Sequence, residues 1–170
     1  MSLSAVLLLV LCSLEYWIEC LLFGTWKFSS TSIGLGLGFL VGGQVIRSVA
    51  MWTCGDSFSH VIKDQNADGK KLVTHGIYSY LRHPSYFGWF YWSIGTQLLL
   101  CNPICCLFYT YASWKFFAQR IPYEEDLLVE FYGNEYIEYA HQTIIGIPFV
   151  STTYSNDFFR CFGGSKSHST

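Results

Sequence analysis

The chain has 170 residues, of which 51% are hydrophobic and 13% are charged, and its formal net charge is −2 at pH 7. This length fits one domain, and the apolar composition is typical of a membrane protein rather than a soluble one. A net charge near zero excludes the basic surface of a nucleic-acid-binding protein. The seven cysteines have no Cys-x-x-Cys spacing and no histidine pair that completes a zinc set, so we predict no structural metal site.

The first apolar segment covers residues 3–23 and contains two acidic residues, Glu15 and Glu19. No basic region precedes it and no small-residue cleavage site follows, which favours a retained membrane helix over a cleaved signal peptide. The two carboxylates are four residues apart and share one helix face. Either this end of the helix lies at the membrane interface, or the acidic face packs on polar groups of neighbouring helices.

The second apolar segment covers residues 33–53 and is rich in glycine. Gly38 and Gly42 are four residues apart, a spacing that lets membrane helices approach closely. Arg47, near the end of the segment, can extend its side chain to the lipid headgroups. We therefore expect two membrane helices within residues 1–53.

A polar region, residues 54–81, leads into Arg82-His83-Pro84, after which the chain carries no charged residue until Lys115. One straight helix over 85–118 would be about 50 Å long, against a hydrocarbon core of about 30 Å. Asn102-Pro103 is a turn signal in the middle of this run. We predict a helical hairpin with arms at about 86–101 and 104–118.

Residues 119–141 have an amphipathic helical pattern, which predicts a helix in water outside the membrane. An apolar segment, 144–150, then returns to the interface, and the Ser/Thr-rich residues 151–170 are expected to form a flexible tail. On this topology all Lys and Arg residues outside the membrane helices fall on one side, except Lys27. The positive-inside rule places that side in the cytosol.

The hairpin brings two polar clusters to the same side. One cluster supplies Tyr78, His83, Tyr86 and the backbone of 70–73, and the other supplies Arg120 and Glu124, four residues apart on one helix face. Such a set offers donors for carboxylates and an acceptor for hydroxyls or an ammonium, which a zwitterionic cofactor needs. Two simpler readings remain: Arg82 and His83 as interfacial anchors, and Arg120 with Glu124 as a surface ion pair.

At these residues the chain closely resembles the isoprenylcysteine carboxyl methyltransferases, from about residue 13 to 150. The match is longest from Arg82 to Cys105. The matching stretches include Ser13-Leu-Glu-Tyr16, Arg82-His-Pro-Ser-Tyr86, Gly88-Trp-Phe-Tyr-Trp-Ser-Ile-Gly-Thr-Gln97, Leu100-Cys-Asn-Pro-Ile-Cys105, Glu124-Glu125 and Gly146-Ile-Pro-Phe149. Animal members have further membrane helices before the first one here, so the resemblance covers only their C-terminal part.

The resemblance implies an all-α, multi-pass membrane protein of the endoplasmic reticulum, with its active site facing the cytosol. We expect one methyltransferase domain over 1–170: membrane helices in 1–53, a catalytic region in 54–150 and the tail in 151–170. The implied reaction transfers a methyl group from S-adenosyl-L-methionine to the C-terminal carboxylate of a prenylated cysteine. The implied partners are processed C-a-a-X proteins, such as Ras- and Rho-like GTPases, and membrane lipid.

The resemblance also implies roles for individual residues. Arg120 is expected to bind the substrate carboxylate and, with Glu124, to form the catalytic pair. The expected cofactor-binding residues are Lys63, Lys70, Lys71, Leu72, Val73, Tyr78, His83, Pro84, Ser85, Tyr86 and Glu124. Lys63 stands where some relatives have Gln, and Lys70-Lys71 replaces an uncharged pair.

The implied nucleophile is a carboxylate, which is ionised near neutral pH, so no general base is required. The enzyme's task is then to hold the reacting atoms in line in a partly dry site. A phospholipid methyltransferase or a sterol-reductase-like enzyme is an alternative, because both share the Arg-His-Pro-x-Tyr-x-Gly segment. A non-catalytic membrane scaffold, formed by a truncated product, is the alternative from another class.

Overall fold

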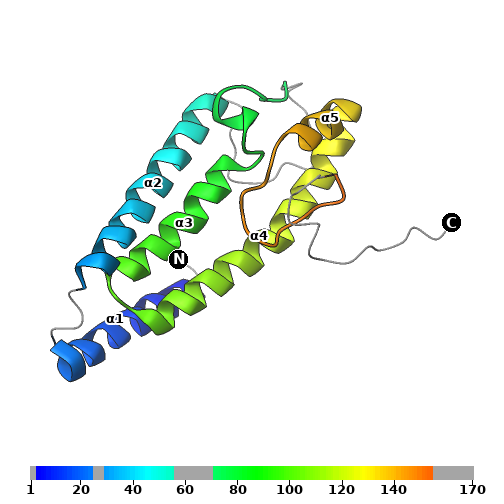
Figure 1. The fold of residues 1–170 in the computed structure, drawn as a ribbon. Coiled ribbons are helices and arrows are strands. Elements are labelled where there is room, and N and C mark those ends of the chain that lie inside the picture. Colours follow the sequence, from blue (N-terminus) through cyan, green and yellow to red (C-terminus); the bar gives the residue numbers. More distant parts are fainter. Residues whose placement is uncertain (1–2, 25–28, 56–70, 155–170) are drawn as a thin grey trace. The chain divides into compact units, whose positions relative to one another are not determined.

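A computed structural model of the protein describes residues 3–24, 29–55 and 71–154, and Figure 1 shows its ribbon. The described residues form helices and contain no strand, only an isolated parallel bridge between Leu81 and Ile144. This confirms the predicted all-α class. The elements in chain order are α1 (Leu3–Phe23), α2 (Ser30–Cys54), the 3-10 turn η3 (Gly76–Ser79), α3 (Pro84–Leu99), α4 (Pro103–Tyr132) and α5 (Asn134–Gln142).

Within the described ranges one helix, α2, is both long and apolar enough to cross a membrane, with a mean hydropathy of 1.5 over its most apolar stretch. The 16 residues of α3 are about 24 Å long, which is short of a hydrocarbon core of about 30 Å. The number of membrane crossings stays a prediction.

The reversal between α3 and α4 lies at residues 100–102, where the sequence predicts it. Cys101 takes a left-handed backbone conformation with φ of 51°. The Asn102 N–H donates to the Gln97 carbonyl at 3.0 Å, and the Asn102 carbonyl accepts from the Cys106 N–H at 2.9 Å. The first bond ties Asn102 to the last turn of α3, and the second ties it to the first turn of α4. Asn102 therefore links the two helices across the reversal.

The helix α4 is longer than expected. We predicted an arm ending near residue 118 and a separate helix over 119–141, but α4 continues to Tyr132 and α5 follows from Asn134. Pro122 lies inside α4 and removes one backbone donor, yet no glycine or turn residue adjoins it. The helix ends at Gly133, which has a φ of 58° that favours glycine.

The contacts divide the chain into two compact units, residues 1–46 with 88–115 and residues 47–87 with 116–170. In the first unit, α2 packs closely on α3 through Gly36 and Gly43. A Cβ on Gly43 would lie 2.5 Å from the Gly88 carbonyl oxygen, and one on Gly36 would lie 2.5 Å from the Leu99 nitrogen. Close glycine packing was predicted, but at Gly38 and Gly42, which have no atom of the described residues within 4 Å of an added Cβ.

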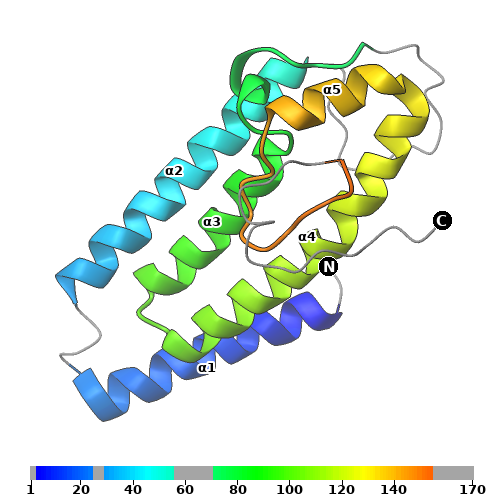
Figure 2. The ribbon, with the colours of Figure 1, turned by 45° about the vertical axis from the view of Figure 1, so that its right-hand side comes forward.

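The helix α1 is attached to the beginning of α4 within the first unit, as both ribbon views show (Figure 2). The two carboxylate oxygens of Glu15 accept the backbone N–H groups of Ile104 at 2.7 Å and Cys105 at 2.8 Å. The Asn102 side chain donates to the Cys12 carbonyl at 3.0 Å. Glu15 therefore caps the N-terminus of α4, where backbone donors lack partners within the helix. For Glu15, this confirms the alternative in which the acidic face packs on polar groups of a neighbouring helix.

The second unit contains the ends of α2 and α4, the start of α3, and α5. Its core includes Tyr136, Tyr139 and Ala140 of α5, against which Leu72, Leu128, Val129, Tyr132 and Tyr154 pack. The segment 143–150 is part of this unit rather than a lone interfacial return, because Ile145, Ile147 and Val150 are buried. Gly146, with φ of 82°, has no room for a Cβ, which would lie 2.6 Å from the Phe87 ring.

Candidate active site

The hydroxyl of Tyr86 joins the two polar clusters in the second unit. It donates to Oε2 of Glu124 at 2.5 Å and accepts from Nε of Arg120 at 2.9 Å. The Arg120 guanidinium also lies over the Tyr86 ring, 5.6 Å from its centroid, and over the Phe116 ring at 5.7 Å. Arg120 and Glu124, one turn apart on α4, are thus held by one residue of α3.

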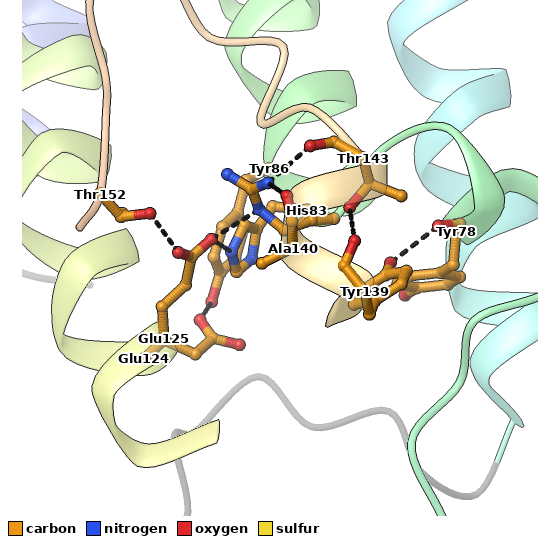
Figure 3. A network of polar contacts seen from close by, with 10 residues as sticks. Tyr78, His83, Tyr86, Glu124, Glu125, Tyr139, Ala140, Thr143 and Thr152 are labelled. Atoms are coloured by element: carbon orange, nitrogen blue, oxygen red, sulfur yellow. Dashed lines mark hydrogen bonds and ion pairs between the residues drawn. The ribbon is translucent and has the colours of Figure 1, made fainter. Parts of the chain in front are cut away.

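A buried ion pair lies beside this group. Nε of Arg82 is 2.9 Å from Oε1 of Glu125, and both side chains are 0% exposed. Nε2 of His83 is 3.1 Å from the same oxygen. The His83 ring also stacks on Tyr86, with centroids 5.4 Å apart and planes 3° apart. Figure 3 shows His83 and Tyr86 side by side, with Glu124 and Glu125 at their lower left. The reading of Arg82 and His83 as interfacial anchors is wrong, because both residues are buried.

The segment after α5 completes this network. Nη1 of Arg82 donates to the carbonyls of Ala140 at 2.5 Å and Thr143 at 2.6 Å. The Arg82 N–H donates to the Ile144 carbonyl at 2.9 Å, which holds the segment beside the Arg-His-Pro motif. The Thr152 hydroxyl donates to Oε2 of Glu125, as Figure 3 shows. Residues 143–152 therefore support both partners of the buried ion pair.

Electrostatics keep the Glu125 carboxyl ionised. Burial raises its pKa, but the hydrogen bond from His83 and the charge of Arg82 outweigh burial and leave this pKa below the ordinary value of 4.5. Tyr78 behaves differently: burial raises the pKa of its phenol far above the ordinary value. Tyr78 is therefore a neutral hydrogen-bonding group near neutral pH.

The other predicted cofactor residues make different contacts or lie outside the described residues. The hydroxyl of Tyr78 donates to the Ala50 carbonyl at 3.4 Å, and its own carbonyl accepts from Tyr139. Pro84 and Ser85 are buried in the first turn of α3. Leu72 and Val73 are half-buried and Lys71 is exposed. Lys63 and Lys70 lie outside the described residues.

Four residues that the structure places in or beside the site had not been assigned to it from the sequence: Arg47, Arg82, Glu125 and Thr152. Arg47 does not simply extend to the membrane surface, because its Nη1 donates to Oγ of Ser85 at 3.1 Å and to the Ser85 carbonyl at 3.3 Å. The adjacent carboxylates at 124 and 125 were one available signal. Successive residues of a helix point about 100° apart, so two neighbouring glutamates serve two different partners.

The family model, the curated relatives and a solved structure all point to the same protein family. The model of the isoprenylcysteine carboxyl methyltransferase (ICMT) family matches residues 35–130. The chain is 46% identical over 136 residues to the protein-S-isoprenylcysteine O-methyltransferase of Xenopus laevis, which covers 80% of this chain and 47% of that protein. It is 45% identical over 145 residues to protein-S-isoprenylcysteine O-methyltransferase A of Arabidopsis thaliana, covering 85% of this chain and 74% of the plant protein.

A solved structure is also similar. The eukaryotic intramembrane Ras methyltransferase ICMT superposes with a TM-score of 0.84 at 42% identity. The match covers 88% of this chain and 53% of that one. The chain thus spans about half the length of the solved structure and of the Xenopus relative.

Proposed function

The chain belongs to the isoprenylcysteine carboxyl methyltransferase family, and we propose that it methylates the C-terminal carboxylate of prenylated cysteine. The supporting observation is the Arg120–Tyr86–Glu124 group, in which a cation and an anion are held on one hydroxyl. A planar guanidinium pairs with a carboxylate through two parallel hydrogen bonds, and this orients both oxygens of the substrate. Arg120 is thereby the residue that aims the nucleophile.

The residues present fit S-adenosyl-L-methionine as the methyl donor. This cofactor carries a carboxylate, an ammonium and ribose hydroxyls, and when bound it supplies an electrophilic methyl group on a sulfonium. Glu124 offers an acceptor for the ammonium or hydroxyls, and the His83 imidazole is a second polar group beside it. Glu124 stays within the site because Tyr86 donates to one of its oxygens. The backbone of 71–73 and Tyr78 complete the proposed cofactor set.

The reaction requires the substrate carboxylate to be oriented toward the methyl group, and it requires no general base. The substrate carboxylate is already an anion near neutral pH, so no residue has to remove a proton from it. Aromatic rings lie beside the charged groups. The ring centroids of Tyr86 and Phe117 are 4.9 Å apart, and those of Phe116 and Phe117 are 5.1 Å apart. Such walls limit water, which favours a step in which opposite charges neutralise each other. The prenyl chain would lie against these rings.

We further propose that the protein is a multi-pass protein of the endoplasmic reticulum membrane with this site facing the cytosol. The exposed apolar side chains of α2, such as Leu37, Val41 and Val45, suit contact with lipid. The cytosolic assignment rests on the positive-inside distribution of Lys and Arg. Ras- and Rho-like C-a-a-X proteins are the proposed substrates, since the solved relative is called a Ras methyltransferase.

A choice of acceptor tests the proposed function. The purified chain in detergent receives labelled S-adenosyl-L-methionine with either farnesyl-cysteine or phosphatidylethanolamine. We expect label in an alkali-labile ester on farnesyl-cysteine, and none on the phospholipid. Label on the phospholipid alone would indicate a phospholipid methyltransferase. A folded chain that neither binds the cofactor nor labels an acceptor would be a scaffold, and the proposal would be wrong.

A further inference from the structure

The orientation of His83 is fixed by a residue outside the proposed set of cofactor-binding residues. Nε2 of His83 lies 3.1 Å from Oε1 of Glu125, and its ring stacks on Tyr86. His83 is 6% exposed, so its surroundings rather than water fix the ring. A ring that is stacked on one side and hydrogen-bonded at one nitrogen has little freedom to rotate.

Glu125 is itself held by two further side chains besides His83. Arg82 Nε lies 2.9 Å from Oε1, and the Thr152 hydroxyl donates to Oε2. Arg82 is in turn fixed by the carbonyls of Ala140 and Thr143. The carboxylate oxygen that meets His83 is therefore placed by residues of three segments: the chain just before α3, the last third of α4 and the end of α5 with the chain that follows it.

The protonation of the ring follows from the chemistry of its partner. An ionised carboxylate only accepts hydrogen bonds. Since the Arg82 guanidinium, 2.9 Å away, keeps Glu125 ionised, Nε2 of His83 must carry the proton of its 3.1 Å contact with Oε1. Nδ1 is then the ring nitrogen left for another group, because a carboxylate beside one nitrogen selects the tautomer of a histidine.

We propose that Glu125 is a positioning residue for methyl transfer, which holds His83 with Nε2 protonated and so presents Nδ1 to the amino-acid end of the methyl donor. This inference rests on the proposed function and adds to it the residue that orients the proposed cofactor ligand. Thr152 has a secondary role, because it holds the second oxygen of Glu125. Glu125 touches neither reactant in this account and acts through His83.

Glu125→Gln tests the proposal, and Asp126→Asn is the matched control. Both changes replace a carboxylate by its amide at adjacent positions of α4, but Asp126 is exposed and its Oδ1 accepts from the Tyr154 hydroxyl at 3.3 Å. An amide carries no charge, so its oxygen is a weaker partner than a carboxylate for the Arg82 guanidinium and the His83 N–H. We expect the dissociation constant for S-adenosyl-L-methionine to rise about tenfold or more in Glu125→Gln. It should stay within about twofold in Asp126→Asn.

A spectroscopic readout separates positioning from a merely structural role. In ¹⁵N-histidine spectra, the signal that disappears in His83→Gln identifies His83. The parent should show this ring protonated at Nε2, and Glu125→Gln should show a mixture of tautomers. A folded Glu125→Gln protein with the parent's cofactor affinity and the parent's His83 signal would overturn the proposal. Failure of the proposed function is a different result, since the parent itself would then neither bind the cofactor nor methylate.

Thr152 provides a second test if Glu125→Gln does not fold. Thr152→Val removes the hydroxyl and keeps the shape, whereas Thr152→Ser keeps the hydroxyl. We expect the dissociation constant for the cofactor to rise about threefold in Thr152→Val and to match the parent in Thr152→Ser. Equal constants for the parent and both variants would contradict the proposal, because Glu125 would then not depend on its third partner.

Discussion

The hydroxyl of Tyr86 donates a hydrogen bond to Glu124 that is 2.5 Å long, although 38 residues separate them in the sequence. This contact connects the first turn of α3 to the last third of α4. It also determines where Arg120 lies, because the same oxygen accepts from Nε of Arg120. The proposed substrate and cofactor ligands therefore depend on one phenol.

The first prediction concerns the loss of the Tyr86 hydroxyl. Tyr86→Phe keeps the ring that stacks on His83 but deprives Arg120 and Glu124 of their common partner. We expect kcat/KM for farnesyl-cysteine to fall about tenfold, as for the loss of a hydrogen bond to charged groups. Tyr111→Phe, at an exposed position of α4, should keep the parent's kinetics. Unchanged kinetics in both variants would show that the hydroxyl does not organise the site.

The second prediction concerns the buried ion pair. Arg82→Leu would leave the Glu125 carboxylate buried without its arginine, and the cost of such a change is about 3–5 kcal/mol. We expect a clear fall in melting temperature in detergent. The double variant Arg82→Leu/Glu125→Leu should recover part of the loss, because no unpaired charge stays buried. A melting temperature equal to the parent's in the single variant would be inconsistent with the ion pair.

The third prediction uses two adjacent glycines of α2. Gly43→Ala would bring a Cβ within 2.5 Å of the Gly88 carbonyl and 2.7 Å of the Trp92 nitrogen, which are backbone atoms that cannot move aside cheaply. It should lower the melting temperature markedly. Gly42→Ala meets no described atom within 4 Å, and Ala favours a helix over Gly by about 1 kcal/mol. Equal effects of the two changes would mean that α2 does not pack on α3 through Gly43.

The fourth prediction is a dependence on acid. Since the pKa of Glu125 lies below its ordinary value of 4.5 in the folded protein, its interactions stabilise the fold fully above about pH 4.5. This contribution is lost as the pH falls through the folded-state pKa. Melting curves between pH 7 and pH 3 should therefore show a steeper loss of stability for the parent than for Glu125→Gln. Parallel losses in the two proteins would contradict the assignment.

Much of the site could be predicted from the sequence, because it depends on where the chain reverses. An uncharged run too long for one helix and a turn signal at Asn102-Pro103 indicate that two polar clusters meet. His83, Tyr86, Arg120 and Glu124 do come together. The resemblance supplied the remaining roles, including those of Lys63 and Lys70, which lie outside the described residues.

Other features depend on tertiary contacts that no local pattern shows. Glu124 and Glu125 are adjacent and chemically identical, so only the packed helix reveals which one meets Tyr86 and which meets His83. Thr152 lies 27 residues from its partner Glu125 and has no motif of its own. The glycine contacts of α2 fall at 36 and 43 rather than 38 and 42, because the face that meets α3 is decided by packing.

The most direct test of the account is the effect of Arg120→Ala on substrate use compared with cofactor binding. Both are measured on one preparation, by methyl transfer to farnesyl-cysteine and by calorimetry with S-adenosyl-L-methionine. We expect kcat/KM for farnesyl-cysteine to fall about a hundredfold or more, since a bidentate charged contact is lost, while the cofactor's dissociation constant changes by less than about threefold. Parent-like kcat/KM in the variant would contradict the role of Arg120 as the residue that binds the substrate carboxylate.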